Sequence, residues 1–202
     1  MICHISINNC RLNPTNLKEN DLLSYRFIVD PKGGEICPKS IFNPYRDLRF
    51  TITESEVVKV AGSLHKYFNH GEYNYDDFSY DKLVKAILEL CRDFGINPME
   101  VALSSMEFGV NIELPFETRL FMDSLVTHKY KEFSGERDAH IDLREVRYQQ
   151  YKVKIYDKGL QNNLPRNLLR FEVKALKMSY LKECEIHTIW DLTYRNKLIL
   201  LK

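Results

Sequence analysis

One segment of the chain could place a tyrosine hydroxyl within a row of ammonium groups. Side chains of an extended strand alternate between two faces, and residues 151–159 alternate in chemistry. Val153 and Ile155 would form an apolar face. The opposite face would carry Lys152, Lys154, Tyr156 and Lys158. Such a face attracts phosphate, and a phenol within it can attack a phosphodiester as a nucleophile.

A second segment adds a carboxylate to this pattern. Residues 167–174 also alternate, and Glu172 lies between Arg170 and Lys174 on the polar side. The connection between the two segments, residues 159–165, has the Gly, Asn and Pro content of a hairpin turn. We therefore expect two antiparallel strands that are neighbours in a sheet.

A third alternating segment, residues 105–114, could bring another carboxylate to the same face. Its polar side carries Glu107, Asn111 and Glu113. If this strand joins the sheet, Glu107 and Glu172 converge near Tyr156, and in another register Glu113 replaces Glu107. Carboxylate oxygens bind hard divalent cations such as Mg²⁺ or Mn²⁺. The cation would polarise a phosphodiester for attack by the phenol, which would leave tyrosine joined to DNA through a phosphate.

Other residues nearby could contribute to this chemistry. Lys158 could lower the pKa of the phenol or neutralise charge in the transition state, although it could also be an ordinary lysine at a strand end. His140 would lie on the polar side of an expected strand over residues 139–143 and could bind the metal, but a surface histidine is the commoner case. Tyr148 and Tyr151 are alternative nucleophiles.

The order and spacing of these motifs resemble the gene II replication initiator of filamentous phages. They resemble more loosely the rolling-circle replication initiators of plasmids. The resemblance rests on four short segments and spans roughly residues 100 to 182. These segments are residues 103–111, 153–160, 169–173 and 179–182. One departure is Ser105-Met-Glu107, where the family commonly has Arg-Ile-Asp, so the carboxylate is kept in a longer form and the neighbouring arginine is lost.

The resemblance implies a function and its participants. The tyrosine matching Tyr156 would nick one DNA strand at an origin and stay attached to the 5′ phosphate, while the released 3′ hydroxyl primes synthesis. The positions matching Glu107 and Glu172 would hold the metal. The partners would be origin DNA, single-stranded or in a hairpin, and a host helicase and polymerase. A phage or plasmid protein of this kind would act in the bacterial cytoplasm.

Composition agrees with one catalytic domain over residues 1–202. The chain is 44% hydrophobic and 28% charged, which is ordinary for a globular protein. Because it shows neither a secretory signal nor an apolar run that could span a bilayer, we expect a cytoplasmic protein. The five cysteines follow no CxxC spacing, which favours reduced thiols. Relatives continue beyond Lys202, so the chain is either a catalytic domain or a short version.

The basic residues are concentrated in the motif region. The net charge of +1 predicts no strong overall field. Residues 144–174, however, contain eight cations against three anions. A local excess of this kind is what binding to a nucleic-acid backbone needs. We expect DNA contacts from Lys152, Lys154, Arg170 and Lys174, although the solvated face of an edge hairpin would look similar.

The expected fold class is α+β. We expect strands over residues 2–9, 22–29, 47–53, 100–114 and 139–143, and then closing strands that end near 176. We expect helices over residues 57–68, introduced by the capping-box pattern at 53–56, and over 80–94, 116–130 and 188–201, with a polar loop at 133–138. Helices packed on one face of a mainly antiparallel sheet would leave the other face for the active site and DNA.

Three functions remain open from the sequence. The leading one is metal-dependent nicking and rejoining of single-stranded DNA at an origin by Tyr156. The second is a non-catalytic module that binds origin DNA or its hairpin with the same basic face and forms no covalent adduct. The third is a hydrolytic nuclease in which water attacks, so that DNA cutting would survive the loss of the tyrosine.

Overall fold

The computed structural model describes residues 2–10, 12–26, 29, 32–34, 40–53 and 55–201. The strands are β1 (Ile2–Cys10), β2 (Tyr25–Arg26), β3 (Ser40–Phe42), β4 (Arg49–Ile52), β5 (Val58–Gly62), β6 (Leu103–Glu113), β7 (Thr127–His128), β8 (Lys131–Glu132), β9 (Ser134–Arg137), β10 (Asp142–Arg147), β11 (Tyr151–Asp157) and β12 (Leu168–Ala175). The α-helices are α1 (Pro14–Lys18), α2 (Leu64–Phe68), α3 (Tyr80–Phe94), α4 (Thr118–Ser124), α5 (Lys158–Gln161) and α6 (Arg195–Ile199), and the 3₁₀ helices are η1 (Met178–Cys184) and η2 (Trp190–Thr193).

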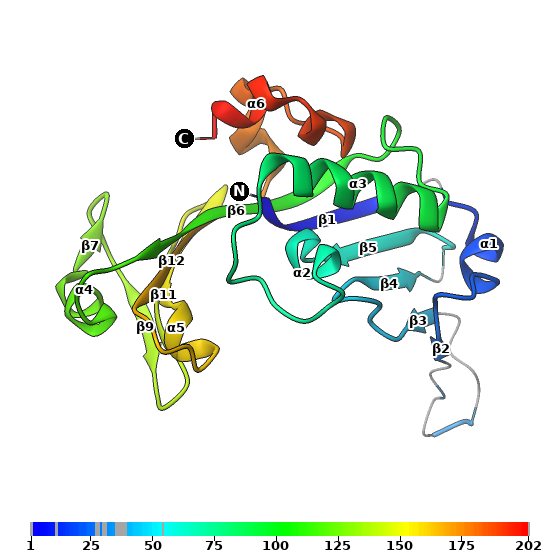
Figure 1. Ribbon diagram of the computed structural model, residues 1–202. Coiled ribbons are helices and arrows are strands. Elements are labelled where there is room, and N and C mark those ends of the chain that lie inside the picture. Colours follow the sequence, from blue (N-terminus) through cyan, green and yellow to red (C-terminus); the bar gives the residue numbers. More distant parts are fainter. Residues whose placement is uncertain are drawn as a thin grey trace.

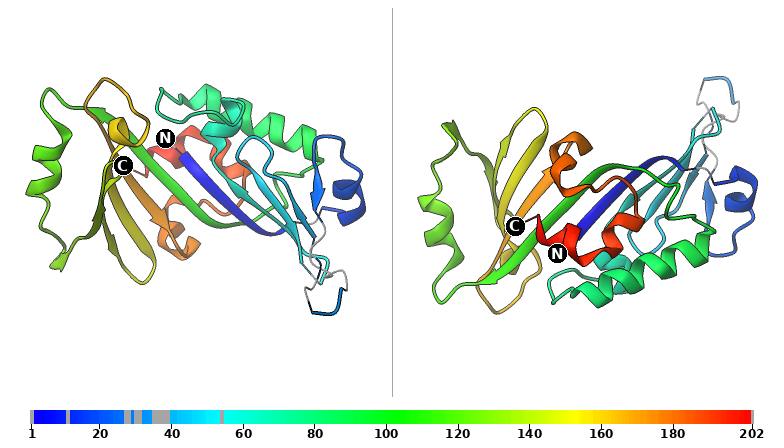
Figure 2. Two further views of the ribbon diagram at one scale, coloured as in Figure 1. Left: turned by 90° about the horizontal axis from the view of Figure 1, so that it is seen from below. Right: turned by 90° about the horizontal axis from the view of Figure 1, so that it is seen from above.

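Ten of the described strands form one antiparallel sheet, which confirms the α+β fold class. Their order is β2-β3-β4-β5-β1-β6-β12-β11-β10-β9, and β7 and β8 form a separate hairpin (Figure 1). The central strands β1 and β6 join the N-terminal strands to the β9–β12 half. The sheet twists strongly between its two ends, as the two further views show (Figure 2).

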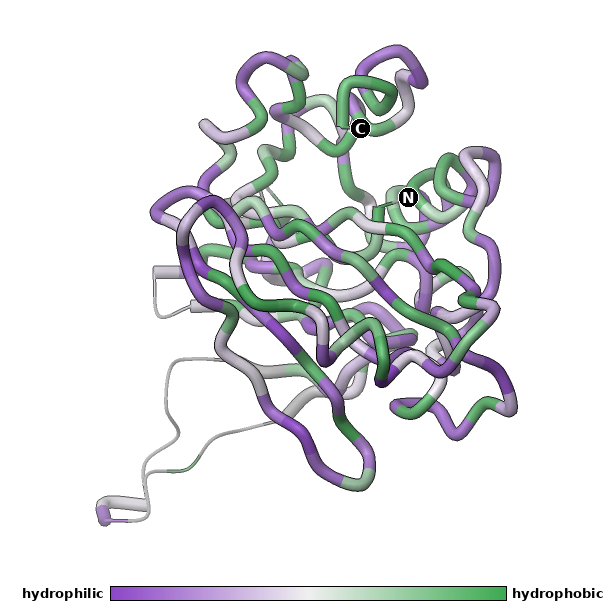
Figure 3. Tube along the Cα trace, turned by 90° about the vertical axis from the view of Figure 1, so that its left-hand side faces the viewer, coloured by the Kyte–Doolittle hydropathy of each residue, from purple (hydrophilic) through white to green (hydrophobic). Residues whose placement is uncertain are grey.

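The register of the strands sorts their side chains onto two faces. Ile5 of β1 lies opposite Met106 of β6, and the adjacent pair, His4 and Glu107, points to the other side. Lys174 of β12 lies opposite Glu107 and extends this second side. We call the side of Ile5 the core face and the side of Glu107 the polar face. Seen from the β9–β12 half, hydrophobic and hydrophilic residues alternate along the strands (Figure 3).

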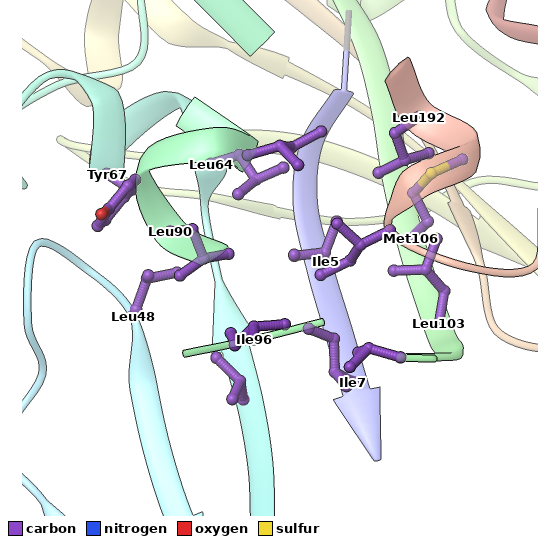
Figure 4. Close-up of a cluster of buried hydrophobic side chains, with 14 of the residues drawn as sticks. Ile5, Ile7, Leu48, Leu64, Tyr67, Leu90, Ile96, Leu103, Met106 and Leu192 are labelled. Atoms are coloured by element: carbon purple, nitrogen blue, oxygen red, sulfur yellow. The ribbon is translucent and has the colours of Figure 1, made fainter. Parts of the chain in front are cut away.

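Helices cover the core face. In the β1 half, Leu64 of α2, Leu90 of α3 and Leu192 of η2 belong to the same buried cluster as Ile5 and Met106 (Figure 4). Burying one such side chain contributes roughly 2 kcal/mol. In the other half, a second cluster contains Met122 of α4 with Val146, Val153, Ile155 and Leu169 of β10, β11 and β12. These two clusters fix the sheet so that its polar face stays available.

Helix α3 confirms the helix predicted over residues 80–94. Ser79 begins it, because its hydroxyl accepts a hydrogen bond from the Lys82 N–H at 3.3 Å. Gly95 ends it with a left-handed φ of 63°, a conformation that glycine adopts without strain. No helix in the described ranges is long and apolar enough to cross a membrane.

The helix predicted over residues 57–68 is wrong in its first half. That part is the strand β5, in which valines at alternate positions are buried, as β-branched residues favour. The helix α2 begins only after Ser63, whose hydroxyl accepts the N–H of the third residue that follows. Thr53 belongs instead to the turn between β4 and β5, where its hydroxyl accepts the Val57 N–H at 3.1 Å. The remainder of the capping-box pattern includes residue 54, which lies outside the described residues.

Two other predicted helices are shorter than expected. The helix over 116–130 is only α4, because Leu125, with φ −77° and ψ 108°, is extended and ends it. Further on, Lys129 and Tyr130 take left-handed φ values of 47° and 65° and form the turn between β7 and β8. The helix over 188–201 is divided into η2 and α6. Tyr194, with φ −98° and ψ 106°, is extended and separates the two.

The strand predictions are mostly confirmed, with different boundaries. β1, β4 and β6 correspond to three of the predicted strands. Of the strand expected over 22–29, residues 25 and 26 form β2, residues 22–24 do not form a strand, and residues 27 and 28 lie outside the described ones. The polar loop expected at 133–138 contains β9, which pairs with β10. The strand expected over 139–143 begins only at Asp142. Before it, the Asp138 carboxylate accepts the His140 N–H at 2.6 Å and forms a turn.

Candidate active site

The three motif strands are neighbours in the sheet, in the order β6-β12-β11. Lys154 of β11 lies opposite Glu172 of β12, and Lys174 of β12 lies opposite Glu107 of β6. Tyr156 follows two residues after Lys154 and therefore points to the same side. The predicted convergence of Tyr156 and the two glutamates on one face is thus present in the structure.

A glycine makes room for Glu172 on this face. Gly109 of β6 lies opposite Glu172. A Cβ at this position would lie 2.1 Å from the carbonyl oxygen of Phe171 and 2.9 Å from Cγ of Glu172. Only glycine, which has no side chain, allows β12 to come this close to residue 109. Strand β6 therefore supplies Glu107 and also leaves the space that Glu172 fills.

Two buried carboxylates share one ammonium group. Nζ of Lys154 lies 2.9 Å from Oε2 of Glu107 and 2.9 Å from Oε2 of Glu172. The other oxygen of Glu107 binds Nζ of Lys174 at 2.7 Å. The other oxygen of Glu172 binds Nε of Arg170 at 2.8 Å. Each of the four carboxylate oxygens therefore has a cationic partner from the chain itself.

These pairs keep both carboxylates ionised. Burial alone would raise the pKa of Glu107, but Lys154 and Lys174 outweigh it and lower that pKa to about 2. Burial would also raise the pKa of Glu172, and the charges of Lys154 and Arg170 hold it below its ordinary value. The pKa of Lys154 is raised by the two glutamates in spite of burial. At neutral pH the cluster contains three cations and two anions.

Tyr156 lies beside this cluster as a protonated phenol. Burial and the negative charge of Glu172 raise the pKa of Tyr156 far above its ordinary value. The ammonium nitrogen of Lys158 lies 5.6 Å from the centroid of its ring. Burial and the carboxylate thus outweigh any lowering of the phenol pKa by Lys158, and the other expected role of Lys158, neutralising charge in the transition state, stays a prediction. The hydroxyl needs a base before it can act as a nucleophile.

Lys158 is suited to be that base. Asp157 ends β11 and caps α5 by accepting the Leu160 N–H at 2.8 Å, which turns the chain so that Lys158 follows Tyr156 closely. Lys158 is 4% exposed, and its ammonium donates to Oε1 of Gln161 at 2.8 Å. Burial and the charge of Arg170 lower the pKa of Lys158 to about 8. A useful fraction of neutral amine is thus present near pH 8.

These groups open into a polar cavity of about 410 Å³. The volume falls in the range of ordinary ligand sites. Residues from four parts of the chain line it: Cys3 and His4 of β1, Asp47, Ser63, Lys66, Glu72 and Asn74 between β3 and α3, Glu107, Lys154, Tyr156 and Glu172 of the motif strands, and Lys158, Gln161 and Asn162 around α5. The cavity is large enough for a phosphodiester and its sugar.

The segment between α2 and α3 closes the cavity on one side. Arg170 donates through Nη1 to Oδ1 of Asn111 at 2.6 Å and to the carbonyl oxygen of Asn74 at 3.5 Å. Asn111 in turn donates through Nδ2 to the carbonyl oxygen of Tyr75 at 3.2 Å. Asn111, an extra candidate from the sequence, therefore helps to hold this segment against the sheet.

Sequence analysis missed His4 and Lys66 of the cavity wall. His4 lies opposite Glu107, and burial lowers the pKa of its imidazole. Lys66 of α2 is partly exposed, and its ammonium lies 3.4 Å from Oδ1 of Asp47. Both residues lie far from the motif strands in sequence, so no spacing pattern points to them. Alternation in β1 could have indicated the face of His4 but not its neighbours.

The side chains that were predicted to contact DNA form ion pairs within the protein. The DNA contact predicted for Arg170 is wrong, because this side chain is 0% exposed. Its guanidinium instead forms a buried ion pair with Glu172. Lys152 pairs with Glu145 at 2.8 Å. Lys154 and Lys174 are only partly exposed and pair with the carboxylates. The polar face is therefore less positive than its sequence suggests.

The remaining candidates lie away from the cavity. Glu113 is exposed, lies 3.5 Å from Arg166 and is not among the residues that line the cavity, so Glu107 is the acidic group of β6. His140 is exposed in the turn before β10, which is against its predicted role as a metal ligand. Tyr148 and Tyr151 stack on each other beside the core-face cluster. Neither is among the residues that line the cavity.

The donor types in the cavity fit a divalent cation. Glu107 and Glu172 supply carboxylate oxygens, and His4 lies beside them. The described residues contain no group of three or more His, Cys, Asp or Glu side chains arranged around a metal position. Lys154 now lies between the two carboxylates, so a metal would have to displace its ammonium. Binding of Mg²⁺ or Mn²⁺ stays a prediction.

Comparison with known proteins supports the fold. No family model matches the sequence, and no curated protein matches it. Among solved structures, the rolling circle replication initiator protein from Geobacillus stearothermophilus superposes with a TM-score of 0.52 at 11% sequence identity. The match covers 91% of this chain and 77% of that protein. The fold is similar to that of a rolling circle replication initiator. At this identity the likeness concerns the fold alone.

Proposed function

We propose that the protein is a rolling-circle replication initiator that nicks and rejoins one strand of origin DNA through Tyr156. The observation that carries the proposal is the position of this phenol, which faces a polar cavity together with Lys158 and the ionised pair Glu107 and Glu172. The similarity to a rolling circle initiator fold supports it. Assignment to the phage gene II type is part of the proposal and rests on the motif segments.

Cations of the cavity would hold the scissile phosphate. Lys66 and Lys158 both line the cavity, and neither forms an ion pair shorter than 3.4 Å with a carboxylate in the described residues. A phosphate bound there would accept hydrogen bonds from the Lys66 ammonium and from an N–H of the neutral Lys158 amine. It would also lie within reach of Tyr156, whose ring is next to Lys158. Single-stranded DNA would enter best, because the backbone of an extruded strand is free to bend into the cavity.

The reaction then exchanges one phosphate ester for another. Neutral Lys158 accepts the proton of the Tyr156 hydroxyl while the phenolic oxygen attacks phosphorus. The new bond joins this oxygen to phosphorus, and the bond from phosphorus to the 3′ oxygen breaks. The protonated lysine returns the proton to the leaving 3′ oxygen. Because the ester bond energy is kept, the 3′ hydroxyl can later reverse the reaction without ATP.

The carboxylate cluster has an electrostatic role in this scheme. Lys154 and Arg170 keep Glu172 ionised, and its charge holds the Tyr156 hydroxyl protonated until Lys158 removes the proton. If Mg²⁺ or Mn²⁺ is bound by Glu107 and Glu172, it would supply Lewis-acid polarisation of the phosphate. The steps above use only groups of the chain.

A covalent adduct tests the proposal. The protein is incubated with single-stranded and supercoiled DNA of its own replicon, with Mg²⁺, with Mn²⁺ and with EDTA. We expect an SDS-resistant protein–DNA adduct that Tyr156→Phe abolishes. Tyr151→Phe is the matched control, since Tyr151 lies on the same strand but stacks beside the core-face cluster. No adduct on DNA that contains the origin would contradict the proposal.

A non-catalytic module that binds origin DNA is the second candidate. All four carboxylate oxygens of Glu107 and Glu172 are paired with lysine or arginine side chains. This favours the second candidate, because such a network can stabilise the fold without taking part in catalysis. This function predicts salt-sensitive binding of the origin without an adduct. A hydrolytic nuclease, in contrast, would cut DNA equally well after Tyr156→Phe.

A further inference from the structure

Three tyrosine rings form a column at the end of β11 remote from Tyr156. The ring centroids of Tyr148 and Tyr151 are 4.6 Å apart at an interplanar angle of 17°, and those of Tyr151 and Tyr180 are 4.4 Å apart at 20°. Tyr151 begins β11, Tyr148 lies in the turn before it, and Tyr180 comes from η1. We call these three residues the tyrosine stack. Tyr151 lies about 17 Å from Tyr156 along the strand.

One end of the tyrosine stack is closed and the other is exposed. At the closed end, the ring of His128 meets Tyr148 edge-on at 5.6 Å, and the Tyr148 hydroxyl donates to the carbonyl oxygen of His128. At the other end Tyr180 is 36% exposed. Near-parallel rings at these separations attract one another, and each exposed face can accept a further flat ring. The column can therefore be extended at Tyr180.

Exposed lysines surround the tyrosine stack. Nζ of Lys129 donates to the Tyr151 hydroxyl at 3.1 Å and lies 5.5 Å from that ring. Nζ of Lys131 lies 5.0 Å from the centroid of the Tyr148 ring. The backbone N–H of Lys177 donates to the carbonyl oxygen of residue 150, so this residue lies beside the turn that contains Tyr148. All three lysines are exposed.

These lysines differ from those of the polar face in their partners. Lys152, Lys154 and Lys174 are paired with glutamates at 2.7 to 2.9 Å. Within the described parts of the chain, no ion pair with a carboxylate involves Lys129 or Lys131. Lys131 donates to the carbonyl oxygen of Arg147 at 3.2 Å and Lys129 to the Tyr151 hydroxyl, so both have neutral partners that leave their positive charge in place.

We infer that the tyrosine stack is a second binding site, which holds the unpaired bases of single-stranded DNA. A base stacks on the exposed ring of Tyr180 and continues the column, while Lys129, Lys131 and Lys177 contact the neighbouring phosphates. Because every base has a flat π face, the site accepts all sequences. It excludes duplex DNA, whose bases are already stacked and paired. The site lies outside the cavity of Tyr156 and does not depend on the nicking reaction.

Single-strand affinity of Tyr180 variants tests this inference. Fluorescence anisotropy is measured with labelled oligothymidylate and with a duplex of equal length. Tyr180→Leu keeps a large apolar side chain but removes the flat ring, and it should weaken binding of the single strand roughly tenfold. Tyr180→Trp should bind at least as tightly as the wild type. Tyr194→Ala is the control, because this tyrosine is also exposed but lies outside the tyrosine stack, and it should leave affinity unchanged.

A charge variant gives an independent readout. The logarithm of the affinity falls linearly with the logarithm of the salt concentration, and the slope depends on the number of phosphates contacted. The double substitution Lys129→Gln with Lys131→Gln should reduce this slope by an amount that corresponds to about two phosphate contacts. Equal single-strand affinity of Tyr180→Leu and the wild type, with both proteins folded by circular dichroism, would overturn the inference. Equal wild-type affinity for single strand and duplex would also overturn it.

Discussion

The ammonium nitrogen of Lys158 lies 5.6 Å from the ring centroid of Tyr156, and the two groups have pKa values displaced in opposite directions. Burial raises the pKa of the phenol, and burial lowers the pKa of the amine to about 8. When their environments shift the pKa values of two neighbouring groups in opposite directions, the two groups are candidates for an acid and a base. In the proposed reaction, the role of proton acceptor is assigned to Lys158 because its ammonium nitrogen lies beside the ring of Tyr156.

The rate of adduct formation should depend on the protonation of Lys158. Because only the neutral amine accepts the proton, the rate should rise with pH and level off above about pH 8. Lys158→Gln should slow the reaction by about 100-fold or more and remove this pH step. Single-turnover kinetics between pH 6 and 10 measure both effects. A wild-type pH profile retained in the variant would exclude Lys158 as the base.

Glu107 should contribute to stability only above acidic pH. Its pKa falls from an ordinary 4.5 in the unfolded chain to about 2 in the folded protein. A lowered folded-state pKa stabilises the protein above pH 4.5, and this contribution is lost as the pH falls toward 2. It amounts to at most about 3 kcal/mol. Urea unfolding at pH 7 and pH 3 should show a smaller difference for Glu107→Gln than for the wild type.

Arg170 should be required for folding rather than for DNA affinity. It is fully buried and pairs with Glu172, so Arg170→Met leaves a carboxylate without its guanidinium and should cost about 3 to 5 kcal/mol. Lys152→Gln breaks a more exposed pair and should cost less than about 1 kcal/mol. Urea midpoints of the two variants compare these values. Similar midpoints would mean that the buried pair is not a determinant of stability.

Lys154 should compete with a divalent cation. Its ammonium lies between Glu107 and Glu172, so Lys154→Gln frees one oxygen of each carboxylate. Titration calorimetry with Mn²⁺ should therefore show tighter binding to this variant than to the wild type. Lys152→Gln, which alters the neighbouring position on the same face, should leave Mn²⁺ affinity unchanged. Unchanged affinity in Lys154→Gln would place any metal elsewhere.

The motif strands were predictable because a strand has a simple period. Alternation in β6, β11 and β12 was enough to place Tyr156, Glu107 and Glu172 on one face. The bridging position of Lys154 was not predictable, since alternation gives the face of a side chain but not its partner. The positions of His4 and Lys66 in the cavity wall were also not predictable from the sequence, because long-range strand pairing and the packing of α2 bring them there.

Errors in the helices have a similar cause. The pattern at 53–56 matches a capping box, but Val58 and Val60 are buried at alternate positions of β5, and pairing with β1 and β4 outweighs the local signal. In α3, by contrast, the Ser79 cap, the apolar period and Gly95 agree, and the helix was predicted with its observed boundaries. Local sequence is informative where such signals do not conflict.

Identification of the attached residue tests the central claim most directly. The wild-type protein is incubated with origin DNA, the adduct is digested with nuclease and protease, and the peptide that carries the nucleotide is sequenced by mass spectrometry. The account predicts a phosphodiester bond between Tyr156 and a 5′ phosphate. Attachment at Tyr148 or Tyr151, or nicked DNA without any attached peptide, would contradict it.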